Sequence, residues 1–273
     1  LDILRSRARI VSIVKDELIA IRDEFDTPRR TEIVEGGADV DDEDLIQRED
    51  MVVTVSHKGY IKRVPLSTYR AQHRGGKGRA GMATRDEDFV TRLFVANTHA
   101  PVLFFSSRGI VYKMKVWKLP VAAPQARGKA LINLLPLEPD ERITTIMPLP
   151  EDEDTWDELN LIFATAKGYV RPISLSSFTN IYSRGLIAIK LEDDDHLISV
   201  HTFTEKRDAL LATRDGQCIR FSLDELRLYG SRNTVGVRGI KLGKGDEVIS
   251  MAVLRHVDAS LEERTAYVKQ ANA

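Results

Sequence analysis

Hydrophobic residues recur at helical spacing through the first 27 positions of the chain. The apolar positions are Leu4, Val11, Val14, Leu18, Ile21 and Phe25, which are separated by 7, 3, 4, 3 and 4 residues. This heptad seam predicts a helix over residues 1–27 that ends before Pro28. Two interpretations stay open: an ordinary helix packed on a core, or the end of a coiled coil whose partner strand is absent from this chain. Residues 28–50, acidic and containing Gly, predict a linker.

From residue 51 onward the pattern changes to short β-branched and aromatic runs that are broken by Gly, Pro and Asn. Four times, a strand leads into a polar turn with Gly and then into a second, basic strand. These segments are 52–64, 102–114, 161–173 and 210–223, and their turn glycines are Gly59, Gly109, Gly168 and Gly216. A repeat of about 50 to 60 residues with about four strands has the size of a propeller blade.

A basic loop follows each of these turns after 15 to 18 residues, and an acidic turn and one more apolar strand come after it. The loops are Arg74-Gly75, Arg127-Gly128, Arg184-Gly185 and the stretch from Arg232 to Gly236. Because blades pack around an axis, corresponding loops recur along the rim, so the sequence predicts a ring of basic loops. We expect an all-β, propeller-like domain over 51–255, with blades at about 51–100, 101–150, 159–204 and 208–255. Residues 256–273 are expected to form a charged, partly helical tail or the start of an insertion.

Composition excludes several classes of protein. The 273 residues are 42% hydrophobic, which suffices for one large domain or two smaller ones. The single cysteine, Cys218, permits neither an internal disulfide nor a cysteine metal cluster, which fits a reducing, cytoplasmic setting. No apolar run approaches 18 residues, so no membrane association is expected. The first thirty residues are too charged for a signal peptide. Since the chain begins at Leu1, we expect it to be a piece of a longer protein.

The net charge of −1 conceals a strong segregation of charge. Residues 51–130 hold fifteen Lys and Arg against three acidic residues, whereas residues 35–50 hold eight acidic residues and 138–158 hold nine, each against one Arg. Such asymmetry is typical of a surface that binds a polyanion. The alternative is that solvated faces happen to cluster.

The loop over residues 72–78 carries the most specific chemistry. It consists of Gln72, His73, Arg74, Gly75, Gly76, Lys77 and Gly78, and it is flanked by Arg70 and Arg79. The glycines permit positive φ and close approach, and successive N–H groups form an anion-binding concavity to which the cations add full charges. This suits a phosphodiester backbone without reading base edges. A flexible surface turn is the alternative. A Walker motif is excluded, because it requires Gly and Ser or Thr where the chain has Ala71 and Gly78.

No catalytic or metal-binding residues are predicted. The six histidines never show a spacing such as H-x-x-x-H. Cys218 lies in an apolar strand and is interpreted as a core residue, and Asp193-Asp194-Asp195 as a solvated turn without an EF-hand pattern.

The loop sequence QHRGGKG resembles the box QRRGGKG that marks the C-terminal domain of the bacterial DNA gyrase A subunit. The resemblance extends to MVVTVSHKGYIKRVPLSTY, FSSRGIVYKMKVWKLP, LINLLPLEPDERIT and VGVRGIKLGKGDEVIS. The first helix with Arg29-Arg30-Thr31-Glu32-Ile33 resembles the returning end of the family's coiled-coil arm, so about residues 1 to 255 are covered. His73 stands where the family has Arg, which removes one fixed charge near pH 7.

The resemblance implies a β-pinwheel, normally of six blades, of which four are visible here, preceded by the helix. It also implies that the rim wraps double-stranded DNA, largely without sequence specificity, so that gyrase introduces negative supercoils with ATP. The box loop would latch this wrap, with counterparts at Arg127, Lys129, Arg184 and Arg232. We also expect DNA contacts from cations of the basic second strands, namely Lys62, Arg63, Lys113, Lys115, Arg171 and Arg220.

Catalysis would lie outside this chain, since the family's cleavage tyrosine follows an arginine and none of the seven tyrosines here does. The implied partners are DNA, the dimeric gyrase A core upstream, and the gyrase B protein in an A2B2 complex in the bacterial, nucleoid-associated cytoplasm. No cofactor is expected in this chain, because ATP and Mg²⁺ would be used through gyrase B. Two alternatives remain: the C-terminal domain of topoisomerase IV, which lacks an intact box, and a propeller-like interaction scaffold.

Overall fold

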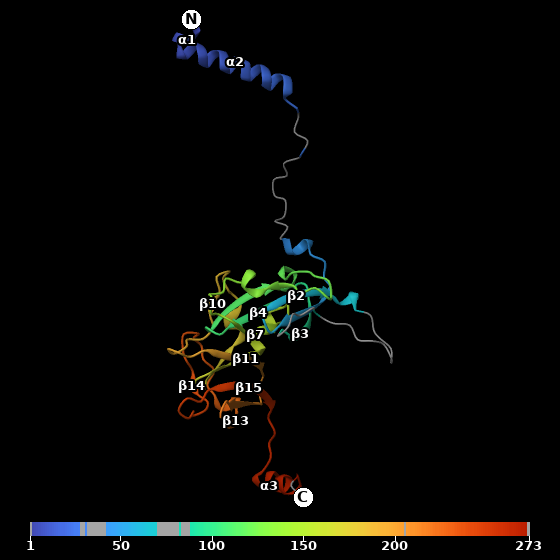
Figure 1. Cartoon of the computed structure of the whole chain (residues 1–273), viewed down its shortest axis with the longest axis vertical. Helices are drawn as coiled ribbons and strands as arrows, with labels where there is room; N and C mark the ends of the chain where they lie inside the picture. The colour runs from blue at the N-terminus through green and yellow to red at the C-terminus, as the bar shows by residue number, and fades with distance from the viewer. Residues whose placement is uncertain are drawn as a thin grey trace. The chain divides into compact units, whose positions relative to one another are not determined.

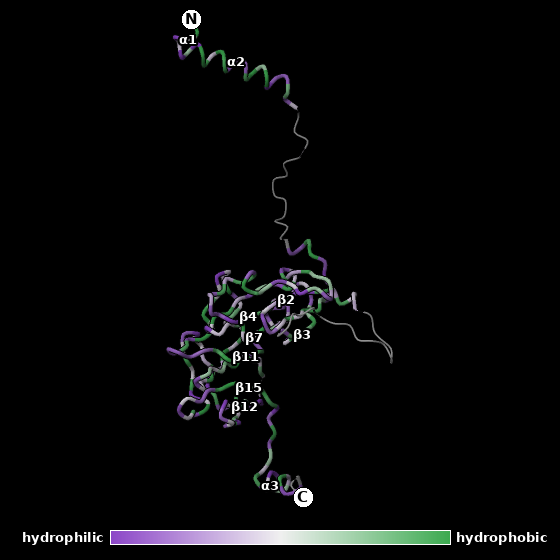
Figure 2. The backbone as a smooth tube through the Cα atoms, in the orientation of Figure 1, coloured by the Kyte–Doolittle hydropathy of each residue, from purple (hydrophilic) through white to green (hydrophobic). Residues whose placement is uncertain are grey.

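The computed structural model describes residues 2–27, 31, 42–69, 82, 88–204 and 206–271, and its contacts divide the chain into the units Leu1–Leu45 and Ile46–Ala273. The first unit contains α1 (Asp2–Arg5), α2 (Arg7–Phe25) and the short 3₁₀ helix η1 (Asp42–Leu45) (Figure 1). Ser6 caps α2 by accepting a hydrogen bond from the Arg9 N–H. Hydrophobic and hydrophilic residues alternate along α2 in Figure 2, and its apolar seam is exposed, up to 69% at Phe25.

Four antiparallel sheets follow one another in the second unit, and each is built on a hairpin (Figure 1). The hairpins and the strands that return to them are β1 (Asp50–Ser56), β2 (Tyr60–Pro65) and β3 (Val90–Asn97); β4 (Pro101–Ser106), β5 (Ile110–Lys115) and β7 (Ile143–Pro148); β8 (Asn160–Thr165), β9 (Tyr169–Ser174) and β11 (Leu197–Phe203); and β12 (Arg207–Thr213), β13 (Cys218–Ser222) and β15 (Val248–Arg255). The predicted all-β, propeller-like architecture with a preceding helix is confirmed, and the hairpins lie at the predicted repeats.

The fourth strand of a sheet comes from the next repeat. These short crossing strands are β6 (Lys129–Ala130), β10 (Leu186–Ile187) and β14 (Val237–Arg238). They give the sheet orders β3-β1-β2-β6, β10-β5-β4-β7 and β11-β8-β9-β14, whereas the last sheet has three strands in the order β13-β12-β15. Each of the first three sheets is therefore completed by its successor.

A glycine precedes each crossing strand because the neighbouring strand leaves no room for a side chain at that position. Gly128 has φ +83°, and a Cβ atom there would lie closer than 3.0 Å to the main chain of Ile61. Gly236 repeats this geometry against the main chain of Val170, whereas a Cβ on Gly185 would overlap the side chains of Ile110 and Tyr112. Each crossing therefore depends on a glycine, which tolerates positive φ.

The hydrophobic core lies between consecutive repeats rather than within one of them. Val53 and Val55 pack against Val102 and Phe104 of the next repeat, and equivalent clusters join the second repeat to the third and the third to the fourth. Because both faces of a middle sheet are covered, its strands are apolar on both sides instead of alternating.

Short helical turns connect these strands. They are η2 (Leu66–Thr68), η3 (Val116–Lys118), η4 (Leu131–Asn133), η5 (Glu153–Glu158), η6 (Leu175–Phe178) and η7 (Leu223–Glu225), and α3 (Leu261–Ala271) follows the last sheet. In η5 the fully buried Trp156 donates its indole N–H to the carbonyl of Pro150 at 3.2 Å, which anchors the insertion between repeats two and three. Among the described residues, no helix is long and apolar enough to cross a membrane.

Candidate nucleic-acid interface

Two cations predicted to contact DNA, Lys62 and Arg171, are fully buried. The Lys62 ammonium donates to the carbonyls of Ala123 and Pro124 in the following repeat. Arg171 donates to the carbonyl oxygens of Ser231 (3.2 Å), Arg232 (2.6 Å), Thr234 (3.3 Å) and Ala188. Burial lowers the pKa of Lys62, and it lowers the pKa of Arg171 to about 10. Both side chains satisfy main-chain carbonyls of a crossing loop, so we assign them to the fold instead of to a DNA surface.

Further strand cations also join neighbouring repeats. Arg63 donates from Nε to Leu119 O at 2.8 Å and from its terminal nitrogen to Trp117 O at 2.9 Å. Lys113 pairs with Glu153 and donates to Thr179 O at 2.9 Å. Hairpin register places these two cations at the same position, which is the fourth residue after the turn glycine. Cations of the second strand therefore hold neighbouring repeats together.

Three other residues predicted to contact DNA differ in their exposure and in their partners. Arg232 is half-buried and donates to Ser177 O at 2.9 Å. Lys115 is half-buried. Arg220 is exposed, but its guanidinium is bound to Asp208.

The predicted loop cations Arg127, Lys129 and Arg184 are better placed for a ligand. Arg127 stacks its guanidinium over the ring of Tyr60, 3.6 Å from the centroid. A stacked guanidinium keeps its N–H edge free to bind an anion while the ring fixes its plane. Lys129 and Arg184 are exposed, and each follows or precedes a crossing glycine. All three lie at the crossing-strand edge of a sheet.

The predicted loop of the first repeat lies outside the described residues. It comprises Arg70, Gln72, His73, Arg74, Gly75, Gly76, Lys77, Gly78 and Arg79. The spacing of residues in the sequence nevertheless indicates which of them correspond to the loops of the other repeats. The crossing glycines Gly185 and Gly236 come ten residues before Asp195 and Asp246, and Gly78 comes ten residues before Asp88. The buried Met82, six residues before Asp88, agrees with this alignment, because Ile189 is buried six residues before Asp195. The spacing predicts that Lys77-Gly78, and not Arg74-Gly75, corresponds to Arg184-Gly185.

Acidic residues are absent from one segment of every repeat, which in the second to fourth repeats contains the crossing strand. Residues 56–85, 108–137, 167–191 and 226–245 contain no Asp or Glu, yet they hold 23 of the 40 Lys and Arg. Sequence reasoning counted charge over longer windows and so missed exposed cations that these segments add. These include Lys118, Lys190, Arg227, Arg238, Lys241 and Lys244. A window matched to the repeat would have found them.

Three acidic residues instead cap hairpin turns. Asp88 accepts the Lys58 N–H at 2.9 Å, and Asp195 and Asp246 accept the N–H groups of Lys167 (2.9 Å) and Asp215 (3.1 Å). For Asp88 and Asp246 burial acts to raise the pKa, but the hydrogen bonds to the carboxylate outweigh it and lower the pKa. These carboxylates are thereby held next to the strand that returns to the opposite edge of the sheet.

The sheet topology brings the crossing strands of different repeats to one edge of the sheets. Crossing strands β6, β10 and β14 occupy the same edge of successive sheets. The returning strands at the opposite edge contact one another, as where the Val200 N–H donates to Thr145 Oγ1 at 3.1 Å. The acid-free segments that contain β6, β10 and β14 consequently reach the same edge of consecutive sheets, where a polyanion could bind to several of them. Among the described residues no cluster of His, Cys, Asp and Glu is suited to a metal ion.

Comparison with known proteins agrees with this repeat structure. The family model described as DNA gyrase C-terminal domain, beta-propeller, matches residues 50–97, 100–150, 159–204 and 207–255, one match for each sheet. The chain belongs to this family. The DNA gyrase A subunit of Rickettsia bellii (strain RML369-C) is 55% identical over 268 residues, which are 98% of this chain and 30% of that protein. The DNA gyrase A subunit of Escherichia coli (strain K12) is 49% identical over 232 residues, which are 85% of this chain and 26% of that protein. The chain thus spans about 30% of the length of these gyrase A relatives.

Solved structures show the same fold. The crystal structure of the C-terminal domain of DNA topoisomerase IV matches with a TM-score of 0.67 and 27% identity, covering 77% of this chain and 62% of that one. The structure of a DNA gyrase A C-terminal domain matches with a TM-score of 0.55 and 27% identity, covering 75% and 65%. The gyrase C-terminal fold predicted from the sequence is therefore confirmed.

Proposed function

We propose that this gyrase-family domain binds double-stranded DNA along the crossing-strand edge of its sheets and bends the duplex around it. The observation that carries the proposal is the recurrence of acid-free, cation-rich crossing segments at one edge of consecutive sheets. A duplex carries phosphates at regular spacing, so a row of such segments contacts it repeatedly and offsets the cost of bending, on the order of 1–6 kcal/mol per 20–30 base pairs.

The proposed contacts are electrostatic and independent of base sequence. Arg127 presents a guanidinium fixed by Tyr60, and Arg184, Lys190 and Lys241 present exposed charges on the next crossing segments. Guanidinium and ammonium groups match phosphate oxygens and carry no information on base edges. By its likeness to the family box, the loop with Arg74 and Lys77 adds the densest group of cations and latches the wrap.

In the whole protein, this domain would deliver wrapped DNA to a catalytic core, so that negative supercoils are introduced with ATP. The partners in this proposal are the gyrase A core and the gyrase B protein in an A2B2 assembly in the bacterial cytoplasm. ATP and Mg²⁺ would act through gyrase B. The gyrase A relatives, which are about three times longer than this chain, support this context.

Salt dependence of DNA binding tests the proposal. We expect the logarithm of the association constant to fall linearly with the logarithm of salt concentration, with a slope of about −0.9 for each phosphate neutralised. Arg184→Ala should weaken binding to any duplex sequence equally and make the slope shallower by about 0.9. Arg214→Ala is the matched control, because Arg214 is also exposed but pairs with Glu247 outside the crossing segments. Binding that ignored salt, or equal effects of the two variants, would contradict a phosphate-binding edge.

The C-terminal domain of topoisomerase IV is the second candidate, since its fold matches with the higher TM-score of the two structures. Gyrase is favoured because the full-length relatives at about half identity are gyrase A proteins and because the near-intact box occurs at residues 72–78. A pure interaction scaffold would not require acid-free segments at one edge.

A further inference from the structure

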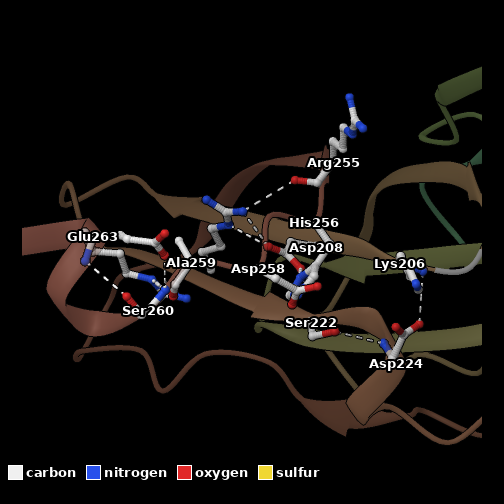
Figure 3. Close-up of polar contacts among 12 residues, drawn as sticks. Lys206, Asp208, Ser222, Asp224, Arg255, His256, Asp258, Ala259, Ser260 and Glu263 are labelled. Carbon is white, nitrogen blue, oxygen red and sulfur yellow. Dashed lines mark hydrogen bonds and ion pairs between the residues drawn. The ribbon is translucent and has the colours of Figure 1, made fainter. Parts of the chain in front are cut away.

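A cluster of charged side chains ties the end of the last sheet together (Figure 3). His256, which directly follows β15, places Nδ1 2.6 Å from Asp208 Oδ1 and Nε2 2.9 Å from Asp258 Oδ1. Arg220 of β13 donates from Nε to the other oxygen of Asp208 at 2.7 Å. Asp208 lies on β12, so the cluster joins two strands of the sheet to the segment that leaves it.

The hydrogen-bond geometry requires a protonated imidazole. A neutral imidazole has one N–H group, and a carboxylate only accepts, so both contacts are hydrogen bonds only when both nitrogens carry protons. The Asp208 side chain is 6% exposed and paired with Arg220, which keeps this carboxyl ionised, whereas Asp258 is 92% exposed. The proton on His256 therefore decides whether the exposed Asp258 is held.

The surrounding charges agree with this requirement. Hydrogen bonds to Asp208 and then to Asp258 raise the pKa of His256 above its usual value. Burial acts to raise the pKa of Asp208, but hydrogen bonds from His256 and Arg220 outweigh it and lower the pKa. The other charged residues on the elements around the imidazole are Lys206 and Arg207 of the β12 region, Asp224 and Glu225 of η7, and Arg255 of β15.

The cluster is particular to the last repeat. Register places Arg220 at the position of Arg63 and Lys113, which donate to carbonyls of the next repeat. Arg220 instead turns to its own sheet, where it also approaches Arg255 O at 3.5 Å. At the position of Asp208 the first two repeats have Met51 and Pro101, which carry no charge.

We propose that His256 is a proton-operated clasp that holds residues 256–260 on the last sheet. With the imidazolium present, the segment is pinned between Asp208 and Asp258; after deprotonation, the one remaining N–H stays with buried Asp208 and Asp258 is released. The held segment leads directly into α3. Ser260 caps that helix: its hydroxyl accepts the Glu263 N–H at 3.2 Å, and its own N–H donates to the Glu263 carboxylate at 2.8 Å (Figure 3). The clasp therefore also positions the start of α3. Since the folded pKa of His256 is raised, the clasp is complete below about pH 6.5 and opens as pH rises through that higher value.

Nuclear magnetic resonance of the whole 273-residue chain tests this directly. The His256 imidazole should titrate above about pH 6.5, and exchange of the hydrogen-bonded amides of His256 and Ser260, corrected for its intrinsic pH dependence, should accelerate across the same transition. Linkage requires about a tenfold loss of protection for each pH unit by which the midpoint exceeds the unperturbed value.

Variants separate the clasp from a general effect on folding. Asp258→Asn, at an exposed side chain, should lower the His256 midpoint and speed exchange of this segment at low pH, and His256→Gln should abolish the pH dependence. His196→Gln, the same change in a hairpin-turn region of another repeat, should leave both readouts unaltered. A His256 midpoint at or below about pH 6.5, or exchange of the His256 and Ser260 amides that does not follow the titration, would overturn the proposal.

Discussion

The glycines of the first sheet permit a matched test of strand exchange. Gly59 and Gly128 have nearly the same φ, +80° and +83°, but a Cβ on Gly59 would meet nothing within 4 Å, whereas one on Gly128 would overlap the main chain of Ile61. Gly59→Ala should therefore add only left-handed strain, about 1–2 kcal/mol, reduced by about 0.4–1 kcal/mol because alanine stiffens the unfolded chain. The expected net loss is about 1 kcal/mol.

Gly128→Ala carries the same strain and must also move β6. That strand pairs through Lys129 and Ala130 with Ile61 and Tyr60, so displacement weakens about two ladder hydrogen bonds at about 0.5–1.5 kcal/mol each. Packing losses at the first interface between repeats add to this, which gives about 3–4 kcal/mol in total. Urea unfolding followed by the fluorescence of Trp117 and Trp156 measures both variants against the parent. Equal destabilisation by the two substitutions would refute the claim that close approach at the crossing holds the repeats together.

Two further predictions concern the buried Arg171 and the half-buried His201. Arg171→Met should destabilise the domain by on the order of 3 kcal/mol in urea unfolding, because four carbonyl acceptors lose a charged donor. The salt dependence of DNA binding should stay unchanged. A changed salt slope with intact stability would contradict the assignment of Arg171 to the fold. Burial, with a further effect of Arg92, lowers the pKa of His201, so its contribution to stability is present above about pH 6.5 and is lost as pH falls through the lower folded value. His201→Leu should flatten the decline in free energy of unfolding on the acid side, and an unaltered pH profile would contradict this.

The hairpins and their repeat were predictable from the sequence because each turn needs a glycine and each strand pair is apolar. Gly109 and Gly168, for instance, follow a cation and lie between two apolar runs in the same way. Periodicity could not show that the fourth strand crosses to the previous sheet. A two-residue strand such as β10 is too short to carry a pattern, and only its glycine, Gly185, marks it.

Charge alone does not distinguish a surface cation from one that satisfies carbonyls, so the sequence could not show that Lys62 and Arg171, two of the predicted DNA contacts, are buried. Arg171 and Arg184 look alike in sequence, yet the first is fully buried under the next repeat and the second is exposed. A buried guanidinium is unusual, and three of its four carbonyl partners here come from residues about 60 positions later in the crossing loop of the next repeat. Such long-range partners cannot be read from spacing.

Wrapping is tested most directly by relaxing a closed circular plasmid with a nicking-closing enzyme in the presence of this chain. We predict a shift in linking number of consistent sign that grows with protein concentration. The shift should be reduced by the pair Arg74→Ala and Lys77→Ala and unaffected by Arg214→Ala. A topoisomer distribution that does not move, under conditions where the chain is bound to the plasmid, would contradict the wrapping of DNA by this domain.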